Sequence, residues 1–380
     1  MIAVSWLVLE KTGSEIALGK VLAISTAPGV LLALLAGNII DRTNRKWLMI
    51  LLDIFRLIVI VIFIYLININ GFTIRILYPI AMLIGLGNSL FWPTAQAFVQ
   101  EIVNDKDYFP ANALLSASYQ VGSILGAGVG GFIVHIYSPI TALYFNAIAY
   151  AVSAIFISLA PFKKSDFSST AEKFLLSIKK GFTFLRLEKN ILILGLTTII
   201  SDVAVWGSLS VLTISISKVI FNKGSWGYGL LDGFYGFGAL LSTILIATLV
   251  KKYGRKKSLI LCYMIAGFSC LISPLLGSIY FAAISYFFMG LNNNTARIII
   301  RTIFMENIPN NIMGRVQIIF GVYTKIMIVV STLLAGIISE KVNINTGVFF
   351  TSLHFVIALL GVITVYYYQK ESKKLFKHRY

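Results

Sequence analysis

Two charged residues stand deep inside long apolar segments of this sequence, Asp202 and Lys325. Counted along a helix, Asp202 lies about 12 residues, or roughly 18 Å, inside its apolar segment, and Lys325 about 10 residues, or roughly 15 Å. An ionisable side chain at such a depth in a bilayer costs on the order of 3 kcal/mol, so it is rarely kept without a function. Because desolvation raises the proton affinity of a carboxylate, Asp202 could take up and release a proton there. A static buried charge, or a residue facing a water-lined cavity, is the alternative.

Aromatic and amide side chains accompany these charges. Trp206 follows Asp202 by one helical turn and offers a face to aromatic or cationic compounds. Trp92, Gln96 and Tyr119 are amphipathic groups that could line a central cavity. Packing inside the protein, or a place at the membrane interface, is the simpler explanation for each of them.

The other charges in apolar segments predict structural roles. Asp53 and Arg56 are one turn apart, so we expect them to form an ion pair that holds the structure. Arg297 and Arg301 are expected near the cytoplasmic surface, where long side chains can reach water.

The segments that must position these residues dominate the composition. Of the 380 residues, 58% are hydrophobic and only 12% are charged, which excludes an ordinary soluble protein. About 20 apolar residues suffice to cross a bilayer as a helix. The sequence therefore predicts an all-α membrane protein with eleven complete spans, at residues 16–40, 47–68, 76–98, 111–135, 140–162, 190–217, 229–250, 258–276, 278–303, 315–339 and 345–369.

The opening segment Met1–Glu10 is apolar but rises only about 15 Å as a helix, half the thickness of the hydrocarbon layer. We expect it to be the second half of a first span whose beginning this chain does not contain.

The positive charge predicts the orientation of the spans. The chain carries 32 Lys and Arg against 15 Asp and Glu, a formal net charge of +17. Most of the basic residues lie in alternate gaps between the spans, including residues 163–189 and the tail after residue 370. The positive-inside rule places these gaps and the C-terminus on the cytoplasmic side of a plasma (inner) membrane.

The gap at 163–189 carries a helical pattern of its own. Within Glu172–Leu187, apolar residues recur at helical spacing opposite Lys and Arg, which predicts an amphipathic helix on an anionic membrane surface. A solvated tether is the alternative. We expect a membrane bundle at 1–162, a cytoplasmic linker at 163–189, a second bundle at 190–370 and a basic tail at 371–380.

The two bundles contain an internal repeat. The stretch from Gly37 to Lys46 is echoed 210 residues later from Ala247 to Lys256, with charged residues at corresponding places. Gly85–Asn88 is similarly echoed by Gly290–Asn293, and Glu101 by Glu306. Two homologous halves of six spans, joined by a cytoplasmic linker, is the plan of one class of membrane transporters.

The sequence lacks the motifs of several other functions. It holds no phosphate-binding G-x-x-x-x-G-K-[ST] loop, so ATP is not expected to drive the protein. Three scattered histidines and two cysteines in one apolar segment, Cys262 and Cys270, predict neither a metal site nor a catalytic nucleophile. We expect no enzyme, no cofactor and no nucleic-acid partner.

The loop Gly37-x-x-x-Asp41-Arg42-x-Asn44-Arg45-Lys46 resembles a signature of the major facilitator superfamily, with Asn44 in place of a glycine. The wider resemblance is to its macrolide-efflux-like exporters. The further residues that carry it are Lys11-Thr12-Gly13-Ser14, Asp53-x-x-Arg56, Phe109-Pro-Ala-Asn112 and Gly122-x-x-x-Gly126-x-x-x-Gly130-Gly131.

This resemblance implies roles for the two loops. An ion cluster of Asp41, Arg42, Arg45 and Lys46 would latch helices in one state and release them in another. The second copy, with Lys251, Gly254, Arg255 and Lys256, would form a weaker gate, since Lys251 replaces the aspartate. The alternative is that these basic residues only anchor the topology.

Two expectations concern helix neighbours. Gly122, Gly126 and Gly130 lie on one helix face and would allow close approach of another helix, although Ala127 stands where antiporters of the superfamily carry proline. The resemblance also makes spans 7 and 11 neighbours, so Asp202 and Lys325 are expected to pair.

The function that the resemblance implies is export of an amphipathic small molecule, such as an antibiotic, in exchange for protons. The substrate site would lie at mid-depth between the two bundles, which rock around it. The expected partners are the substrate, protons and membrane lipid, with the protein a monomer. An importer of a nutrient or metabolite, or a shortened form that does not transport, are the alternatives.

Overall fold

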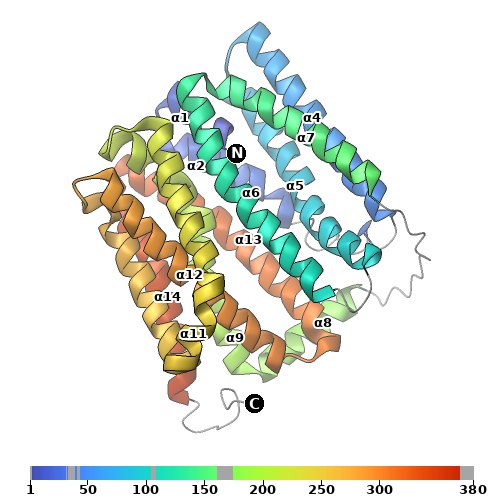
Figure 1. The fold of residues 1–380 in the computed structure, drawn as a ribbon, viewed down its shortest axis with the longest axis vertical. Coiled ribbons are helices and arrows are strands. Elements are labelled where there is room, and N and C mark those ends of the chain that lie inside the picture. Colours follow the sequence, from blue (N-terminus) through green and yellow to red (C-terminus); the bar gives the residue numbers. More distant parts are fainter. Residues whose placement is uncertain are drawn as a thin grey trace. The chain divides into compact units, whose positions relative to one another are not determined.

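The computed structural model of the chain is helical throughout the part it describes, residues 2–30, 32, 39–40, 43–103, 108–160 and 174–368 (Figure 1). This confirms the all-α part of the predicted fold class. The chain divides into two compact units, Met1–Ala171 (unit 1) and Glu172–Tyr380 (unit 2).

Unit 1 is a bundle in which α5 packs against α2 and α4, and α4 also packs against α7. Side-chain caps begin several of its helices: Ser14 accepts a 3.0 Å hydrogen bond from the Ala17 N–H, and Asn44 one of 3.2 Å from Trp47. Its helices are α1 (Ile2–Thr12), α2 (Glu15–Thr26), α4 (Arg45–Asn70), α5 (Ile74–Ile102), α6 (Tyr108–Ile136) and α7 (Pro139–Leu159).

Unit 2 has α8 lying across the lower ends of α9 and α13 in Figure 1. Its helices are α8 (Phe174–Leu187), α9 (Lys189–Val203), the π-helical turn η2 (Ala204–Ser208), α10 (Leu209–Ser215), a second π turn η3 (Ile216–Ile220), α11 (Gly224–Ile272), the 3₁₀ turn η4 (Ser273–Leu275), α12 (Ile279–Asn307), α13 (Asn310–Lys341) and α14 (Ile344–Tyr368). Helix α11 folds back on itself at Gly254, where φ is +73°, a conformation that glycine adopts without strain.

Eight segments of the described chain are long and apolar enough to cross a membrane, and they match eight of the predicted spans. They are Arg45–Asn70, Ile74–Val99, Pro139–Leu159, Lys189–Ile220, Gly224–Ile246, Thr248–Leu275, Ile312–Lys341 and Ile344–Tyr366. Helix α12 is not among them because three consecutive asparagines, Asn292 to Asn294, make its centre polar. The total of eleven spans stays a prediction.

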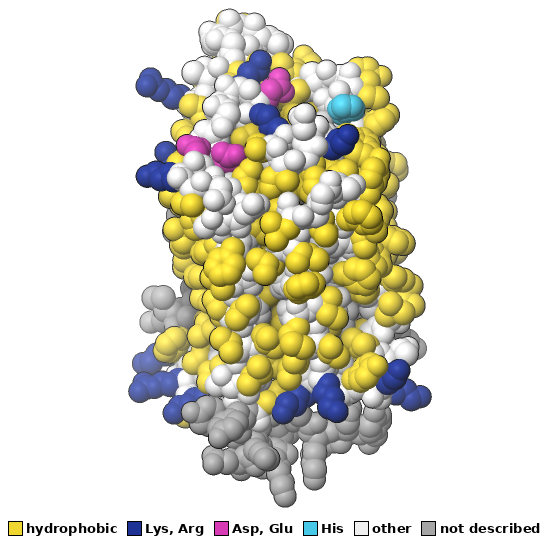
Figure 2. Space-filling model, turned by 90° about the vertical axis from the view of Figure 1, so that its left-hand side faces the viewer, with side chains coloured by type: hydrophobic (Ala, Val, Ile, Leu, Met, Phe, Trp, Pro, Cys, Tyr) yellow, Lys and Arg dark blue, Asp and Glu magenta, His cyan; other side chains and the backbone are white. Residues whose placement is uncertain are grey.

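The surface agrees with a membrane environment. On the face drawn in Figure 2, hydrophobic side chains cover the middle, and Lys and Arg gather towards the upper and lower ends. Large apolar side chains such as Ile58, Phe268 and Leu360 are at least half exposed, which suits contact with lipid.

Glycines of the repeat allow corresponding helices to touch. A Cβ added at Gly85 would lie 1.7 Å from the Ser25 carbonyl oxygen, and one at Gly290 would lie 2.0 Å from the Tyr235 carbonyl oxygen. The predicted glycine face of α6 behaves differently. A Cβ at Gly122 or Gly126 would meet no atom of the described residues within 4 Å. The close approach expected along the row that ends at Gly130 is therefore not seen at its first two glycines.

The predicted amphipathic helix exists as α8, but its apolar face is divided. Leu185 is buried in a core with α9 and α13 instead of facing lipid. Phe182 remains exposed, together with Lys179 and Arg186. The reason is that Gly181 fits closely on α13, where an added Cβ would lie 2.9 Å from the Arg315 Cβ.

Candidate functional site

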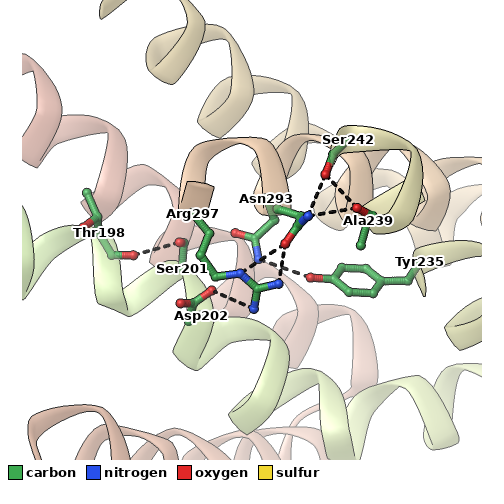
Figure 3. Close-up of polar contacts among 9 residues, drawn as sticks. Thr198, Ser201, Asp202, Tyr235, Ala239, Ser242, Asn293 and Arg297 are labelled. Carbon is green, nitrogen blue, oxygen red and sulfur yellow. Dashed lines mark hydrogen bonds and ion pairs between the residues drawn. The ribbon is translucent and has the colours of Figure 1, made fainter. Parts of the chain in front are cut away.

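Asp202 stands at the junction of α9 and η2, within an apolar span of unit 2 (Figure 3). Its Oδ1 atom is buried and makes no hydrogen bond with a described residue. The Arg297 Nη1 atom of α12 lies 4.0 Å away, close enough for electrostatic attraction but too far for a direct hydrogen bond. The two side chains keep 25% and 19% of their surface exposed, so the pair is not sealed on every side.

Arg297 is held in place by a neighbouring amide. Its Nε and Nη2 atoms both donate to the Asn294 Oδ1 atom, the Nε bond being 3.2 Å long. Asn294 in turn donates from Nδ2 to the Ala239 carbonyl oxygen at 2.8 Å and to the Ser242 hydroxyl at 2.6 Å. Since both of these lie on α11, the guanidinium is braced from the side opposite Asp202 (Figure 3).

A second asparagine completes the polar surroundings. Asn293 is buried and donates from Nδ2 to the Tyr235 hydroxyl at 3.2 Å, while its Oδ1 atom has no partner among the described residues. We call Asp202, Tyr235, Asn293, Asn294 and Arg297 the Asp202 patch. It combines one fixed cation with two acceptor oxygens that have no hydrogen-bond partner among the described residues.

The prediction that Asp202 pairs with Lys325 is wrong. Helix α13, which carries Lys325, does neighbour α9 and η2, as expected for spans 7 and 11. No ion pair joins Lys325 to Asp202, although both are described. Arg297 takes that place, because α12 continues to Asn307 and leaves Arg297 some nine residues, roughly 14 Å, before the Glu306 end.

The place of Arg297 near the cytoplasmic surface stays a prediction, whereas its contact with Asp202 was not expected from the sequence. The signal that could have located it is the run of three asparagines just before it, because amides inside an apolar helix can anchor a guanidinium. A further acidic residue that the sequence analysis did not single out is Asp232 of α11. It forms no ion pair with a described residue.

Trp206, one turn after Asp202, lies on η2 and is 41% exposed. In unit 1, Trp92 of α5 and Tyr119 of α6 are in contact, with ring centroids 4.9 Å apart. Gln96 is exposed one turn after Trp92 on α5. The structure thus gathers the predicted cavity residues into two groups, one in each unit.

The first predicted loop ties helix ends together within unit 1. The Arg45 Nη1 atom lies 3.4 Å from the Glu101 Oε2 atom and donates to the Ala97 carbonyl oxygen at 3.2 Å. Lys46 donates to the Ala160 carbonyl oxygen, at the C-terminus of α7, at 2.7 Å. Of the other predicted residues, Gly37, Asp41 and Arg42 lie outside the described part of the chain, so the latch stays a prediction.

The second loop repeats this arrangement in unit 2. Arg255 donates two hydrogen bonds to Glu306, of 2.5 and 2.7 Å. The Lys256 ammonium lies 4.7 Å from the centre of the Tyr366 ring, near the end of α14. Gly254 supplies the turn, and Lys251 is exposed. The basic residues of the repeat therefore hold equivalent helix ends in both units.

Asp53 and Arg56 form the expected ion pair of unit 1, and both are buried. Ser153 donates to the second carboxylate oxygen of Asp53 at 2.7 Å, and Arg56 donates to the Asn88 Oδ1 atom at 2.8 Å. The guanidinium also lies 4.2 Å from the centre of the Phe91 ring. Every charged atom of this pair is thus matched locally.

No group of three or more His, Cys, Asp or Glu side chains suited to hold a metal ion occurs in the described residues. Cys262 and Cys270 are buried and unbonded.

Apolar helices in two units, with matching ion pairs at the same points of a sequence repeat, define a multi-pass membrane protein built by duplication. The sequence profile described as Major Facilitator Superfamily matches residues 1–332 and 209–378. The chain belongs to this family, and it is accordingly a secondary transporter and not an enzyme.

Three curated relatives are similar to most of the chain. The putative bacilysin exporter BacE of Bacillus amyloliquefaciens is 25% identical over 329 residues, covering 85% of this chain and 80% of that protein. Multidrug resistance protein MdtG of Rahnella sp. (strain Y9602) is 24% identical over 319 residues, covering 83% and 76%. The multidrug efflux pump Tap of Mycolicibacterium fortuitum is 21% identical over 377 residues, covering 96% and 90%.

The crystal structure of the nucleoside transporter NupG shares the fold. It superposes with a TM-score of 0.72 at 12% sequence identity, covering 96% of this chain and 95% of that one.

Proposed function

We propose that the chain exports an amphipathic small molecule, of the antibiotic or macrolide-like class, across the plasma membrane in exchange for protons. Transport by alternating access is the mode expected of this family. The similarity to proteins named as a bacilysin exporter, a multidrug resistance protein and a multidrug efflux pump supports export and this substrate class.

The open charge pair of Asp202 is the observation that carries the proposal. A carboxylate inside an apolar span is expensive unless it is neutralised by a partner or by a proton. The Arg297 Nη1 atom lies 4.0 Å from the buried Oδ1 atom of Asp202, which accepts no hydrogen bond from a described residue. Arg297 therefore compensates the charge of Asp202 only in part, and we propose that a proton is the other partner of this carboxylate.

Exchange follows from competition for this one carboxylate. A proton neutralises Asp202, while a substrate carrying a cationic or hydrogen-bond-donating group would bind the charged form. Trp206, one turn away and exposed, can stack on an aromatic part of the same substrate. Asn294 keeps Arg297 in place whichever occupant is bound, so the site need not rebuild in each cycle.

In this proposal the first loop acts as the gate, with Asp41 forming and releasing contacts as the state changes. Arg45 and Lys46 keep the helix ends of unit 1 together during that movement. The exposed basic and aromatic residues of α8 would rest on the lipid surface at the cytoplasmic side, where the C-terminus also lies.

The experiment uses inside-out membrane vesicles that contain the full chain and whose interior is more acidic than the medium. Ethidium serves as a fluorescent amphipathic probe. The unaltered protein should accumulate ethidium against its gradient. Asp202→Asn should abolish this uphill accumulation, because the amide cannot carry a proton, while downhill ethidium movement should remain measurable at higher ethidium concentrations, since the cation loses only one of its contacts. Uphill accumulation by Asp202→Asn at the level of the unaltered protein would contradict the proposal.

Asp232→Asn is the matched control, because it removes another carboxylate from an apolar helix of unit 2 outside the Asp202 patch. It should keep uphill accumulation. If only Asp232→Asn loses uphill accumulation, the proton-binding carboxylate is Asp232 of α11 and not Asp202. Gradient-driven movement of the probe in the opposite direction would indicate an importer.

A further inference from the structure

Three buried side chains form a hydrogen-bonded chain across unit 2, outside the Asp202 patch. The Ser208 hydroxyl of η2 lies 2.5 Å from the Ser331 hydroxyl of α13. The Ser331 hydroxyl lies 3.1 Å from the His354 Nε2 atom of α14. All three residues are buried. Polar groups in such surroundings are costly unless paired, so the chain joins three separate helical segments at one specific alignment.

The direction of the hydrogen bonds follows from the histidine. Its Nδ1 atom lies 3.1 Å from the Phe350 carbonyl oxygen. Since a carbonyl only accepts, Nδ1 carries the proton of the neutral ring and Nε2 is the acceptor. Ser331 therefore donates to His354, which leaves its oxygen to accept from Ser208. Each hydroxyl donates once, and the chain ends on the ring.

The segment held by this chain is the π turn η2, directly after Asp202. A π turn is a poor helix geometry that persists mostly where function requires it. Ser208 ends η2, and Gly207 beside it lies so close to α13 that an added Cβ would be 3.2 Å from the Ser331 Cβ and Oγ atoms. Trp206 lies on the same turn, facing outward where Ser208 faces inward.

We propose that Ser331 and His354 are positioning residues for the Asp202 patch. They fasten η2 to α13 and α14 through Ser208, and so set the direction in which Trp206 points and the angle at which α9 presents Asp202. The role in transport rests on the proposed function of Asp202, whereas the effect on Trp206 is a property of the structure alone.

The direct test measures Trp206 in a chain where the other four tryptophans, Trp6, Trp47, Trp92 and Trp226, are replaced by phenylalanine. Ser331→Ala should shift the Trp206 emission maximum and raise its quenching by acrylamide. Ser339→Ala is the matched control, because this hydroxyl is also buried on α13 and has no partner in the described part of the chain. It should change neither quantity. Equal Trp206 spectra in the two variants would overturn the proposal.

The histidine is tested by a conservative pair. His354→Gln keeps an acceptor oxygen for Ser331 and should leave the Trp206 emission spectrum unchanged. His354→Leu removes the acceptor and should give the same spectrum as Ser331→Ala. Identical spectra for these two variants would show that only ring packing matters.

A second measurement uses ethidium transport with all tryptophans in place. Ser331→Ala should raise KM about five-fold with little change in the maximal rate, the loss expected for one hydrogen bond that orients a binding group. Ser339→Ala should leave both unchanged. If ethidium is not transported by any variant while the Trp206 shift is present, the function proposed for Asp202 fails and the positioning role stands. An unchanged KM in Ser331→Ala with active transport refutes the role in binding.

Discussion

The two units hold their intramembrane charge pairs in opposite ways. In unit 1, Asp53 and Arg56 are 1% and 5% exposed, lie on one helix and are surrounded by Ser153 and Asn88. In unit 2, Asp202 and Arg297 come from different helices, are separated by 4.0 Å and leave one carboxylate oxygen without a hydrogen bond. A pair that is closed on all sides can only support the structure. A pair that is left open can exchange a partner.

The repeat makes this contrast sharper, because the helices correspond. Arg45 and Arg255 occupy the same point of the two copies, and at the same spacing Asp53 corresponds to Tyr263 and Arg56 to Ala266. Unit 2 has thus no ion pair at the position where unit 1 is closed. Its own pair lies on α9 and α12. The contacts of the repeat are thus present in both units, whereas their intramembrane charge pairs lie on different helices.

The largest expected effect is a difference in the free energy of unfolding between variants of Asp53 and of Asp202. Asp53→Asn should destabilise the protein by about 3–5 kcal/mol, because it leaves a buried guanidinium unpaired. Asp202→Asn should change stability by less than about 1 kcal/mol, since the pair is loose and partly exposed. Thermal unfolding of the purified protein in detergent measures both. Replacing Asp53 and Arg56 together by leucine and methionine should recover most of the loss, and equal unfolding temperatures for the two single variants would remove the contrast.

A smaller effect is expected at the helix contacts, where the two units should respond alike. Gly85→Ala and Gly290→Ala each force a Cβ against a backbone oxygen, at 1.7 and 2.0 Å, and should cost about 1–3 kcal/mol. Gly122→Ala is the control on an open face and should be neutral, or stabilising by up to about 1 kcal/mol through helix propensity. Loss of stability in Gly122→Ala would show that this face is packed after all.

The smallest effect concerns the ion pairs of Arg45 with Glu101 and of Arg255 with Glu306. Glu101 is 9% exposed and Glu306 is 47% exposed. Glu101→Gln should therefore cost about 1–3 kcal/mol, and Glu306→Gln less than about 1 kcal/mol. Unfolding measured at low and high salt distinguishes them, because screening should erase only the difference between Glu306→Gln and the unaltered protein. The same salt response at both sites would mean that the pairs are equally exposed.

What the sequence determined by itself is local or repeated. Apolar runs predicted eleven spans, and eight of them are helices of the described chain that are long and apolar enough to cross a membrane, because the bilayer requires one continuous stretch for each. The ion pair of Asp53 and Arg56 followed from their spacing on a single helix. The echo of Arg45 by Arg255 and of Glu101 by Glu306 marked residues that form the same contact in both units.

Only the tertiary structure decided which residues meet across helices. Lys325 lies on a helix next to Asp202 and still does not reach it, whereas Arg297 does. The chain from Ser208 through Ser331 to His354 could not be foreseen from three ordinary residues far apart in sequence. The physical reason is that hydropathy specifies which segments are helical and buried. The rotation of each helix, its length and its π turns specify which side chains face one another, and these are set by the packing of the whole bundle.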